Sequence, residues 1–191
     1  MPNQNAIIVA MTVAGLTSSF MFMLVIPIQA DLPALLNASR ADTAWVVTST
    51  LLAAAIIAPI SGRLGDMYGK RRIVLILLAA MILGSVLAAL SSSLLLVVIG
   101  RTLQGAMTGV IPLGIAILRD TLHQNRVDTA IALNSATMGI GGAIGMPLSA
   151  YVAQIGDWHL LFWMSAVLGA ICFILVIWFI QRRVSKGSGR L

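Results

Sequence analysis

Six long apolar stretches divide this chain, and short polar or charged segments separate them. An α-helix rises 1.5 Å per residue, so about 20 apolar residues cross the roughly 30 Å hydrocarbon core of a bilayer. The third stretch is shorter, but the next follows almost at once, so the three serines at 91–93 are predicted to form a tight turn. The pattern predicts six membrane-spanning helices, at residues 6–28, 44–62, 73–90, 94–118, 129–153 and 159–180.

The composition favours a membrane protein over a soluble domain. Of the 191 residues, 59% are hydrophobic and 9% are charged, and the mean hydropathy is +1.00. A soluble domain carries roughly 25% charged residues, so this chain has too few to solvate a globular surface. We therefore predict an all-α integral membrane fold, with one six-helix transmembrane bundle over residues 1–181 and a basic tail over residues 182–191.

The distribution of cations predicts the orientation of the bundle. The net charge is +6, but the cations lie in short gaps and not on one face of a soluble fold, which argues against nucleic acid as a partner. Lys and Arg are enriched in cytoplasmic loops, and only Arg40 falls on the other side. Both termini are therefore predicted to be cytoplasmic. We expect a multi-pass protein of the plasma (inner) membrane. The cytoplasmic cations are Arg63, Lys70, Arg71, Arg72, Arg119, Arg126, Arg182, Arg183, Lys186 and Arg190.

One short segment concentrates this charge. The stretch SGRLGDMYGKRR, residues 61–72, holds four cations, one anion and three glycines. Anchoring on the cytoplasmic side suffices to explain Arg63, Arg71 and Arg72. It does not explain Asp66, the single acid of the stretch.

Arg101 is the one cation inside a predicted span, about seven residues from its start. An unpaired guanidinium there costs at least ~2.5–3.5 kcal/mol, so we expect Arg101 to face a polar partner or a cavity. Gln104 and Thr108 extend the same helix face. Two interpretations remain open: a structural pair with a carbonyl, or a role in solute or proton movement.

The fifth stretch contains a run of small residues at helical spacing: Thr137, Gly141, Gly145 and Ser149 lie four apart. Such residues let helix backbones approach closely in a membrane. The run does not complete a dinucleotide-binding fingerprint, and no strand precedes it. We interpret it as a helix-packing seam, either fixed or able to move.

Residues for catalysis or metal binding do not gather in the sequence. His123 and His159 fall in different predicted loops on opposite sides of the membrane, and Cys172, the only cysteine, is expected to be a small packing residue. The chain has no Glu, and all six Asp residues lie near span ends. We therefore expect no enzyme activity, no cofactor and no metal.

Three motifs, in order, resemble those of the major facilitator superfamily. Gly62-Arg-Leu-Gly-Asp66-Met-Tyr-Gly69-Lys70-Arg71-Arg72 is similar to the family's G-x-L-a-D-r-x-G-r-k/r motif between helices two and three. Arg101-Thr-Leu-Gln104-Gly105 resembles R-x-x-Q-G in helix four. Gly141-x-x-x-Gly145-Met-Pro147 resembles the antiporter motif of helix five, although Met146 interrupts it and Leu148-Ser149-Ala150 replaces the usual glycine pair.

The resemblance implies roles for these residues. Gly62, Asp66, Gly69, Lys70, Arg71 and Asp120 would belong to a cytoplasmic conformational gate, with an Asp66–Lys70–Asp120 network that breaks as the transporter switches. Arg101, Gln104 and Gly105 would belong to the proton or substrate pathway, and Gly141, Gly145 and Pro147 to the antiport-like motif.

The resemblance also implies the architecture and the partners. The chain would be the N-terminal half of a major facilitator fold, a 3+3 inverted repeat, with its tail the start of the central loop. A second six-helix half, in the same full-length chain or in another subunit, would complete a drug:proton antiporter-like exporter of small organic molecules working by alternating access. Its partners would be the small-molecule substrate, protons and membrane lipid. The alternative is a non-transporting membrane subunit or a truncated relic.

Overall fold

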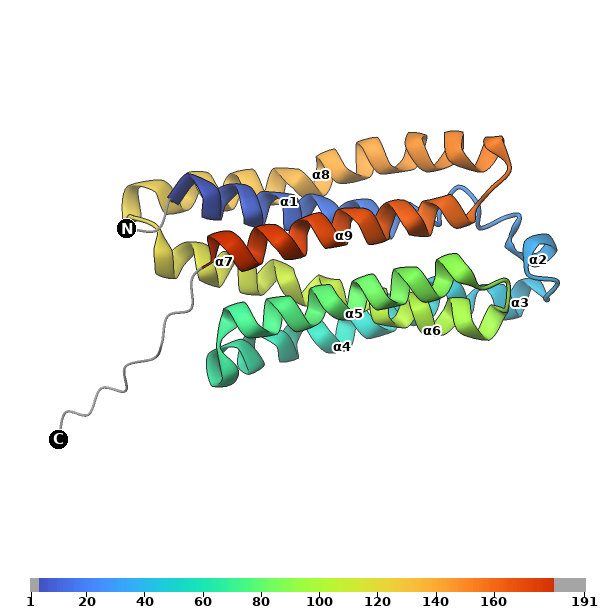
Figure 1. Ribbon diagram of the computed structural model, residues 1–191, viewed down its shortest axis with the longest axis horizontal. Coiled ribbons are helices and arrows are strands. Elements are labelled where there is room, and N and C mark those ends of the chain that lie inside the picture. Colours follow the sequence, from blue (N-terminus) through green and yellow to red (C-terminus); the bar gives the residue numbers. More distant parts are fainter. Residues whose placement is uncertain (1–3, 181–191) are drawn as a thin grey trace.

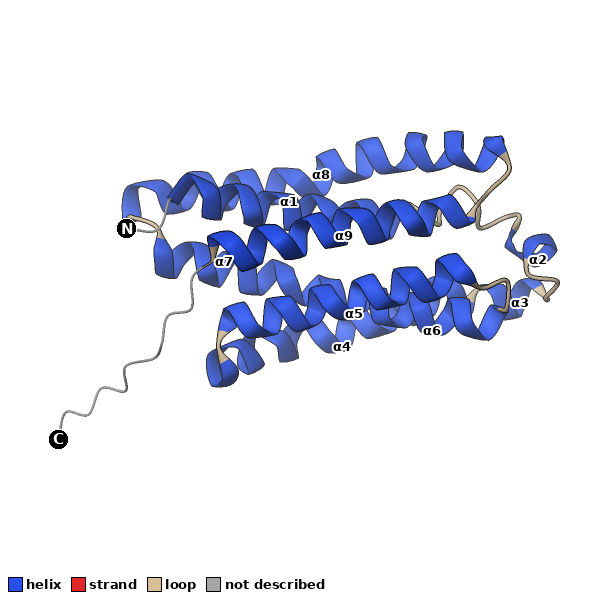
Figure 2. Ribbon diagram, in the orientation of Figure 1, coloured by secondary structure: helices blue, strands red, loops and turns tan. Residues whose placement is uncertain are grey.

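The computed structural model describes residues 4–180, and within this range it contains helices and loops but no strand (Figure 2). Six helical spans are long and apolar enough to cross a membrane. They are α1 (Gln4–Met23), α4 (Trp45–Tyr68), α5 (Lys70–Leu90), the continuous run of α6 (Leu94–Gly105), η1 (Ala106–Gly109) and α7 (Val110–Thr121), then α8 (Gln124–Ile155) and α9 (His159–Phe179). Two short helices, α2 (Leu32–Leu35) and α3 (Arg40–Thr43), lie between α1 and α4.

The spans lie side by side along the long axis of the molecule (Figure 1). The start of α1, the end of α9, and the α4–α5 and α7–α8 turns meet at one end, whereas α2, α3 and the other two turns meet at the opposite end. We call the first the basic end, because it carries Arg63, Lys70, Arg71, Arg72, Arg119 and Arg126 among the described residues. The predicted cations of the tail lie outside the described residues.

The first helix ends earlier than the apolar pattern predicts. The prediction extends it to residue 28, but α1 stops at Met23, and tight turns fill residues 24–31. There the amide of Ile26 donates to the Met23 carbonyl and the amide of Gln29 to the Ile26 carbonyl, each three residues back. Pro27 has no amide hydrogen and disfavours a helical conformation at Ile26. The apolar sequence therefore continues to residue 28, although the helix ends at Met23.

The charged stretch 61–72 is almost entirely helical, and not the loop expected between spans two and three. Helix α4 continues to Tyr68 and α5 begins at Lys70. Gly69 alone separates them, with φ of +95°, in the range that favours glycine. Because one residue makes this turn, the charges at the two helix ends have little freedom to move apart.

The fourth span tightens at its centre. The 3-10 turn η1 interrupts it just before Pro112. Pro112 has no amide to donate to the carbonyl of Thr108, four residues earlier, and its ring crowds that carbonyl. Separately, the Thr108 hydroxyl donates to the Gly105 carbonyl at 2.9 Å, so this side chain bonds within its own helix.

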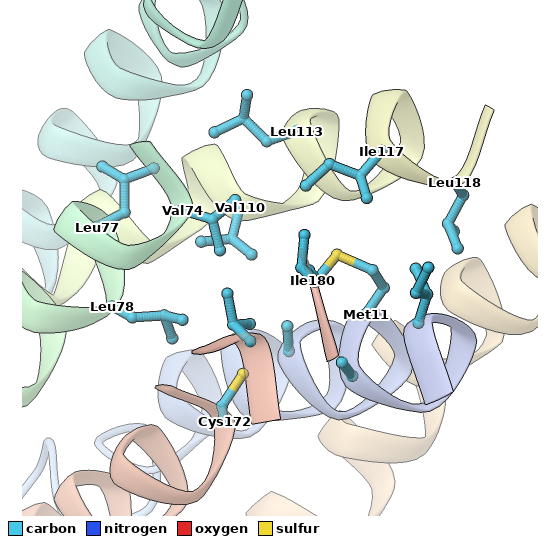
Figure 3. Close-up of a cluster of buried hydrophobic side chains, with 14 of the residues drawn as sticks. Met11, Val74, Leu77, Leu78, Val110, Leu113, Ile117, Leu118, Cys172 and Ile180 are labelled. Carbon is cyan, nitrogen blue, oxygen red and sulfur yellow. The ribbon is translucent and has the colours of Figure 1, made fainter. Parts of the chain in front are cut away.

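The apolar core near the basic end joins helices that are distant in sequence (Figure 3). Met11 of α1, Val74 of α5, Val110 of α7 and Cys172 of α9 are all buried in it. Cys172 is a free, buried thiol and packs among apolar side chains. A second apolar cluster, which includes Phe20, lies around Trp158 and Phe162.

Helix α8 packs on α1 through the run of small residues. Thr137, Gly141, Gly145 and Ser149 all lie on its buried face. A Cβ atom on Gly141 would stand 2.8 Å from the Cβ of Ser19 and 2.9 Å from the Leu16 carbonyl oxygen. The Ser19 hydroxyl in turn donates to the Met138 carbonyl of α8. Glycine at 141 therefore permits backbone contact between the two helices.

Gly141→Ala tests this seam, with Gly139→Ala as its matched control on the same helix. A Cβ at Gly139 would meet nothing within 4 Å. We expect Gly141→Ala to destabilise the bundle by about 1–3 kcal/mol through overpacking, and Gly139→Ala to be neutral or slightly stabilising, as glycine removal from an exposed helix is. Thermal unfolding of the purified protein in detergent measures both. Equal midpoints for the two variants would contradict the close approach.

Candidate functional site

A three-residue ion network crosses the basic end. The Lys70 Nζ lies 2.6 Å from Asp120 Oδ2, at the end of α7, and 3.7 Å from Asp66 Oδ1, near the end of α4. Lys70 is one-quarter exposed, Asp120 half exposed and Asp66 mostly exposed. The structure thus brings together the three charges that the motif resemblance groups.

Each charge of this network occupies an unfavourable position on its own helix. Lys70 is the first residue of α5, where the helix dipole is positive. Asp66 and Asp120 lie in the last turns of α4 and α7, where the dipole is negative. Mutual pairing offsets these local penalties, so the three charges are favourably placed only while the three helix ends remain together.

Glycines shape the backbone around the network. A Cβ on Gly65 would overlap a Leu113 methyl group of α7 and lie 3.4 Å from Lys70 Cγ, so Gly65 lets α4 approach α7 and Lys70. Gly69 makes the one-residue turn, while a Cβ on Gly62 would meet nothing within 4 Å. We did not single out Gly65 from the sequence, although its place inside the G-x-L-G-D motif was a usable signal.

Arg71 lies apart from the two carboxylates. Its Nη2 donates to the Ile177 carbonyl in the last turn of α9, at 2.9 Å. The final carbonyls of a helix lack partners within the helix, and a cation near them is favourable. Arg71 therefore ties α5 to the end of α9 in this structure, while Arg63 and Arg72 are exposed.

A second polar cluster lies inside the bundle, around Arg101. This side chain is 1% exposed. Its Nη1 donates to Gln104 Oε1 at 2.8 Å and to the Met21 carbonyl of α1 at 3.3 Å, and its Nε donates to the Val46 carbonyl of α4 at 3.4 Å. No carboxylate faces it among the described residues; its charge is met by neutral oxygen atoms.

Gln104 extends these contacts to two further helices. Its Nε2 donates to the Ser85 hydroxyl of α5 at 2.7 Å, and Ser85 Oγ lies 3.3 Å from the Ser165 hydroxyl of α9. All three side chains are fully buried. We call the set Arg101, Gln104, Ser85 and Ser165 the buried polar chain. With the carbonyls that Arg101 contacts on α1 and α4, it links five of the six spans. The sequence did not predict Ser85 and Ser165, because no local pattern identifies residues 80 positions apart as partners.

Gly105 lets the buried polar chain lie close to α4. A Cβ on this residue would stand 2.5 Å from the Thr50 carbonyl oxygen and 2.9 Å from Ala53 Cβ. Glycine therefore permits α6 to press against α4 one turn from Arg101.

Within residues 4–180, no group of three His, Cys, Asp or Glu residues lies close enough to hold a metal ion.

Comparison with known proteins decides the family. The model for "Major Facilitator Superfamily" matches residues 8–190, nearly the whole chain. The chain belongs to the major facilitator superfamily. The fold agrees: the inward-open xylose transporter XylE from E. coli superposes with a TM-score of 0.80 at 15% identity, over 92% of this chain and 47% of that one. The all-helical six-span architecture is therefore that of a major facilitator half.

Two relatives illustrate the sequence similarity. An uncharacterized MFS-type transporter, YvkA of Bacillus subtilis, is 31% identical over 81% of this chain and 35% of its own length. The probable multidrug resistance protein EmrY of Escherichia coli is 30% identical over 80% of this chain and 30% of its own length. The chain thus spans about a third of these relatives, and it is a multi-pass membrane protein of a transporter family.

Proposed function

We propose that this chain forms the N-terminal half of a proton-coupled exporter of drugs or small organic molecules. The observation that carries the proposal is the Lys70 network at the basic end, where three helix ends meet through charges that each helix disfavours locally. An arrangement of this kind suits a contact that forms in one state of an alternating-access cycle and breaks in the other.

The relatives support export as the direction. EmrY is named a probable multidrug resistance protein. The tetracenomycin C resistance and export protein of Streptomyces glaucescens is 28% identical over 91% of this chain.

We assign the antiport-like role to Gly141, Gly145 and Pro147, whose helix packs closely on α1. Helix α8 continues unbroken through Pro147.

A second six-helix half would complete the pathway. Helices α4 and α8 are the least covered spans, and large apolar side chains such as Leu52, Ile56 and Met138 are exposed on them.

All six aspartates of the chain are exposed and lie at or near helix ends. We therefore place the proton-carrying carboxylate in the second half, and assign Arg101, Gln104 and Gly105 to holding the helices that border the pathway.

The gate role predicts a separation between transport and stability. We expect Asp66→Asn and Asp120→Asn, each in the full-length transporter, to reduce substrate efflux by about two- to fivefold, since the contact proposed for the closed state loses one attraction. Exposed ion pairs contribute only about 0–1 kcal/mol, so thermal unfolding and membrane abundance should change little. Asp128→Asn, which removes an exposed acid at the same end, is the control. Normal efflux by both gate variants at normal abundance would refute the gate.

The orientation has its own test. We propose that the basic end faces the cytoplasm, because Arg40 is the single Lys or Arg at the opposite end of the described chain. In a Cys172→Ala background, a membrane-impermeant maleimide should label Ser39→Cys in intact cells. It should label Arg63→Cys only after permeabilisation. The reverse pattern would overturn the orientation.

A further inference from the structure

A cavity with both polar and apolar walls opens between α1 and α8 at the basic end. Its volume is about 300 Å³, and it lies away from the Lys70 network and from the buried polar chain. Polar groups line it at the helix starts, and apolar side chains line it one to two turns further into the bundle. The lining residues are Asn5, Ile8, Val9, Asn125, Arg126, Thr129, Ala130 and Leu133.

Arg126 gives the cavity a net positive charge. Its Nη2 donates to the Asn5 side-chain oxygen at 2.7 Å, which joins the start of α1 to the start of α8. Within residues 4–180, no carboxylate lies within ion-pair distance of Arg126, and no acid lines the cavity. The neutral amide orients the guanidinium and leaves its charge uncompensated.

The apolar wall continues from this charge toward the opposite end of the bundle. Val9 is 51% exposed and Leu133 45% exposed. Leu133 and Ile140 follow Arg126 at seven-residue intervals on α8, so the three share one face of the helix, and Ile140 is also exposed. A charged group at the membrane surface above a strip of exposed apolar side chains matches the shape and polarity of a phospholipid.

We propose that this cavity binds an anionic phospholipid, with the headgroup phosphate on Arg126 and an acyl chain along Val9 and Leu133. The inference rests on the proposed orientation, because anionic lipids are characteristic of the cytoplasmic leaflet, and basic pockets between helices on that side bind their headgroups. Charge complementarity selects the anionic headgroup. The apolar wall selects a lipid over a free anion.

Mass spectrometry of the detergent-purified protein tests the proposal, with phosphatidylglycerol and phosphatidylcholine as probes. We expect a preference for phosphatidylglycerol that falls roughly fivefold in Arg126→Gln, the size expected for one cation near a lipid surface. Arg119→Gln, which removes an exposed cation at the same end but outside the cavity, should keep the preference. Val9→Trp, which fills the apolar wall, should weaken retention of both lipids.

Two further outcomes would overturn the inference. An equal loss of preference in Arg126→Gln and Arg119→Gln would mean that diffuse charge and not this cavity attracts the lipid. Displacement of phosphatidylglycerol by inorganic phosphate at comparable concentration would make the site one for a free anion. Lipid retention in detergent requires neither transport nor a given orientation, so its failure is separate from the efflux and labelling results.

Discussion

The need to satisfy a buried guanidinium without a carboxylate organises this bundle. Arg101 lies inside a membrane-spanning helix, where an unpaired charge is expensive. Its partners are carbonyls of α1 and α4 and the side chain of Gln104. Because these oxygens belong to different helices, Arg101 is satisfied only when α1, α4 and α6 are correctly placed. The single cation thereby specifies how three helices meet.

The remaining links of the buried polar chain widen that constraint. Gln104 requires Ser85 on α5, and Ser85 lies beside Ser165 on α9. Lipid offers no hydrophobic drive for helix association, so polar contacts and close backbone approach must supply specificity. The glycines at 105 and 141 provide the second of these, against α4 and α1. The buried polar chain thus connects the helices of the interior, in contrast to the basic end, where Lys70, Asp66 and Asp120 oppose the dipoles of their own helices.

Much of the fold could be predicted from the chain, for identifiable reasons. Membrane thickness demands long apolar runs, so the six spans were readable, and three motifs in order indicated the superfamily. The positions of the helix ends were harder to predict from the sequence. Residues 24–28 are apolar but not helical, because Pro27 interrupts the backbone bonding. Residues 63–68 carry Arg63 and Asp66 yet remain helical, because a single glycine, Gly69, suffices for the turn.

The candidate site was predictable in its charges and not in its contacts. Asp66, Lys70 and Asp120 could be grouped through the motif resemblance, and the ion pairs now have distances. For Arg101, the sequence left open whether it pairs with a carbonyl or takes part in solute or proton movement. That choice depended on its partners, which include carbonyls far away in sequence. Ser85 and Ser165 look like ordinary small residues in apolar helices. Contacts between helices depend on rotation and depth, which a one-dimensional pattern does not encode.

A double-mutant cycle on Arg101 and Gln104 tests the central constraint most directly. The free energy of unfolding would be measured in mixed micelles for Arg101→Met, Gln104→Leu and the double variant. Each single change strands a buried polar partner, so the double variant should be less destabilised than the sum of the two, by about 1–3 kcal/mol. Additive effects within about 0.5 kcal/mol would show that the two side chains are not coupled, and would contradict a bundle organised around them.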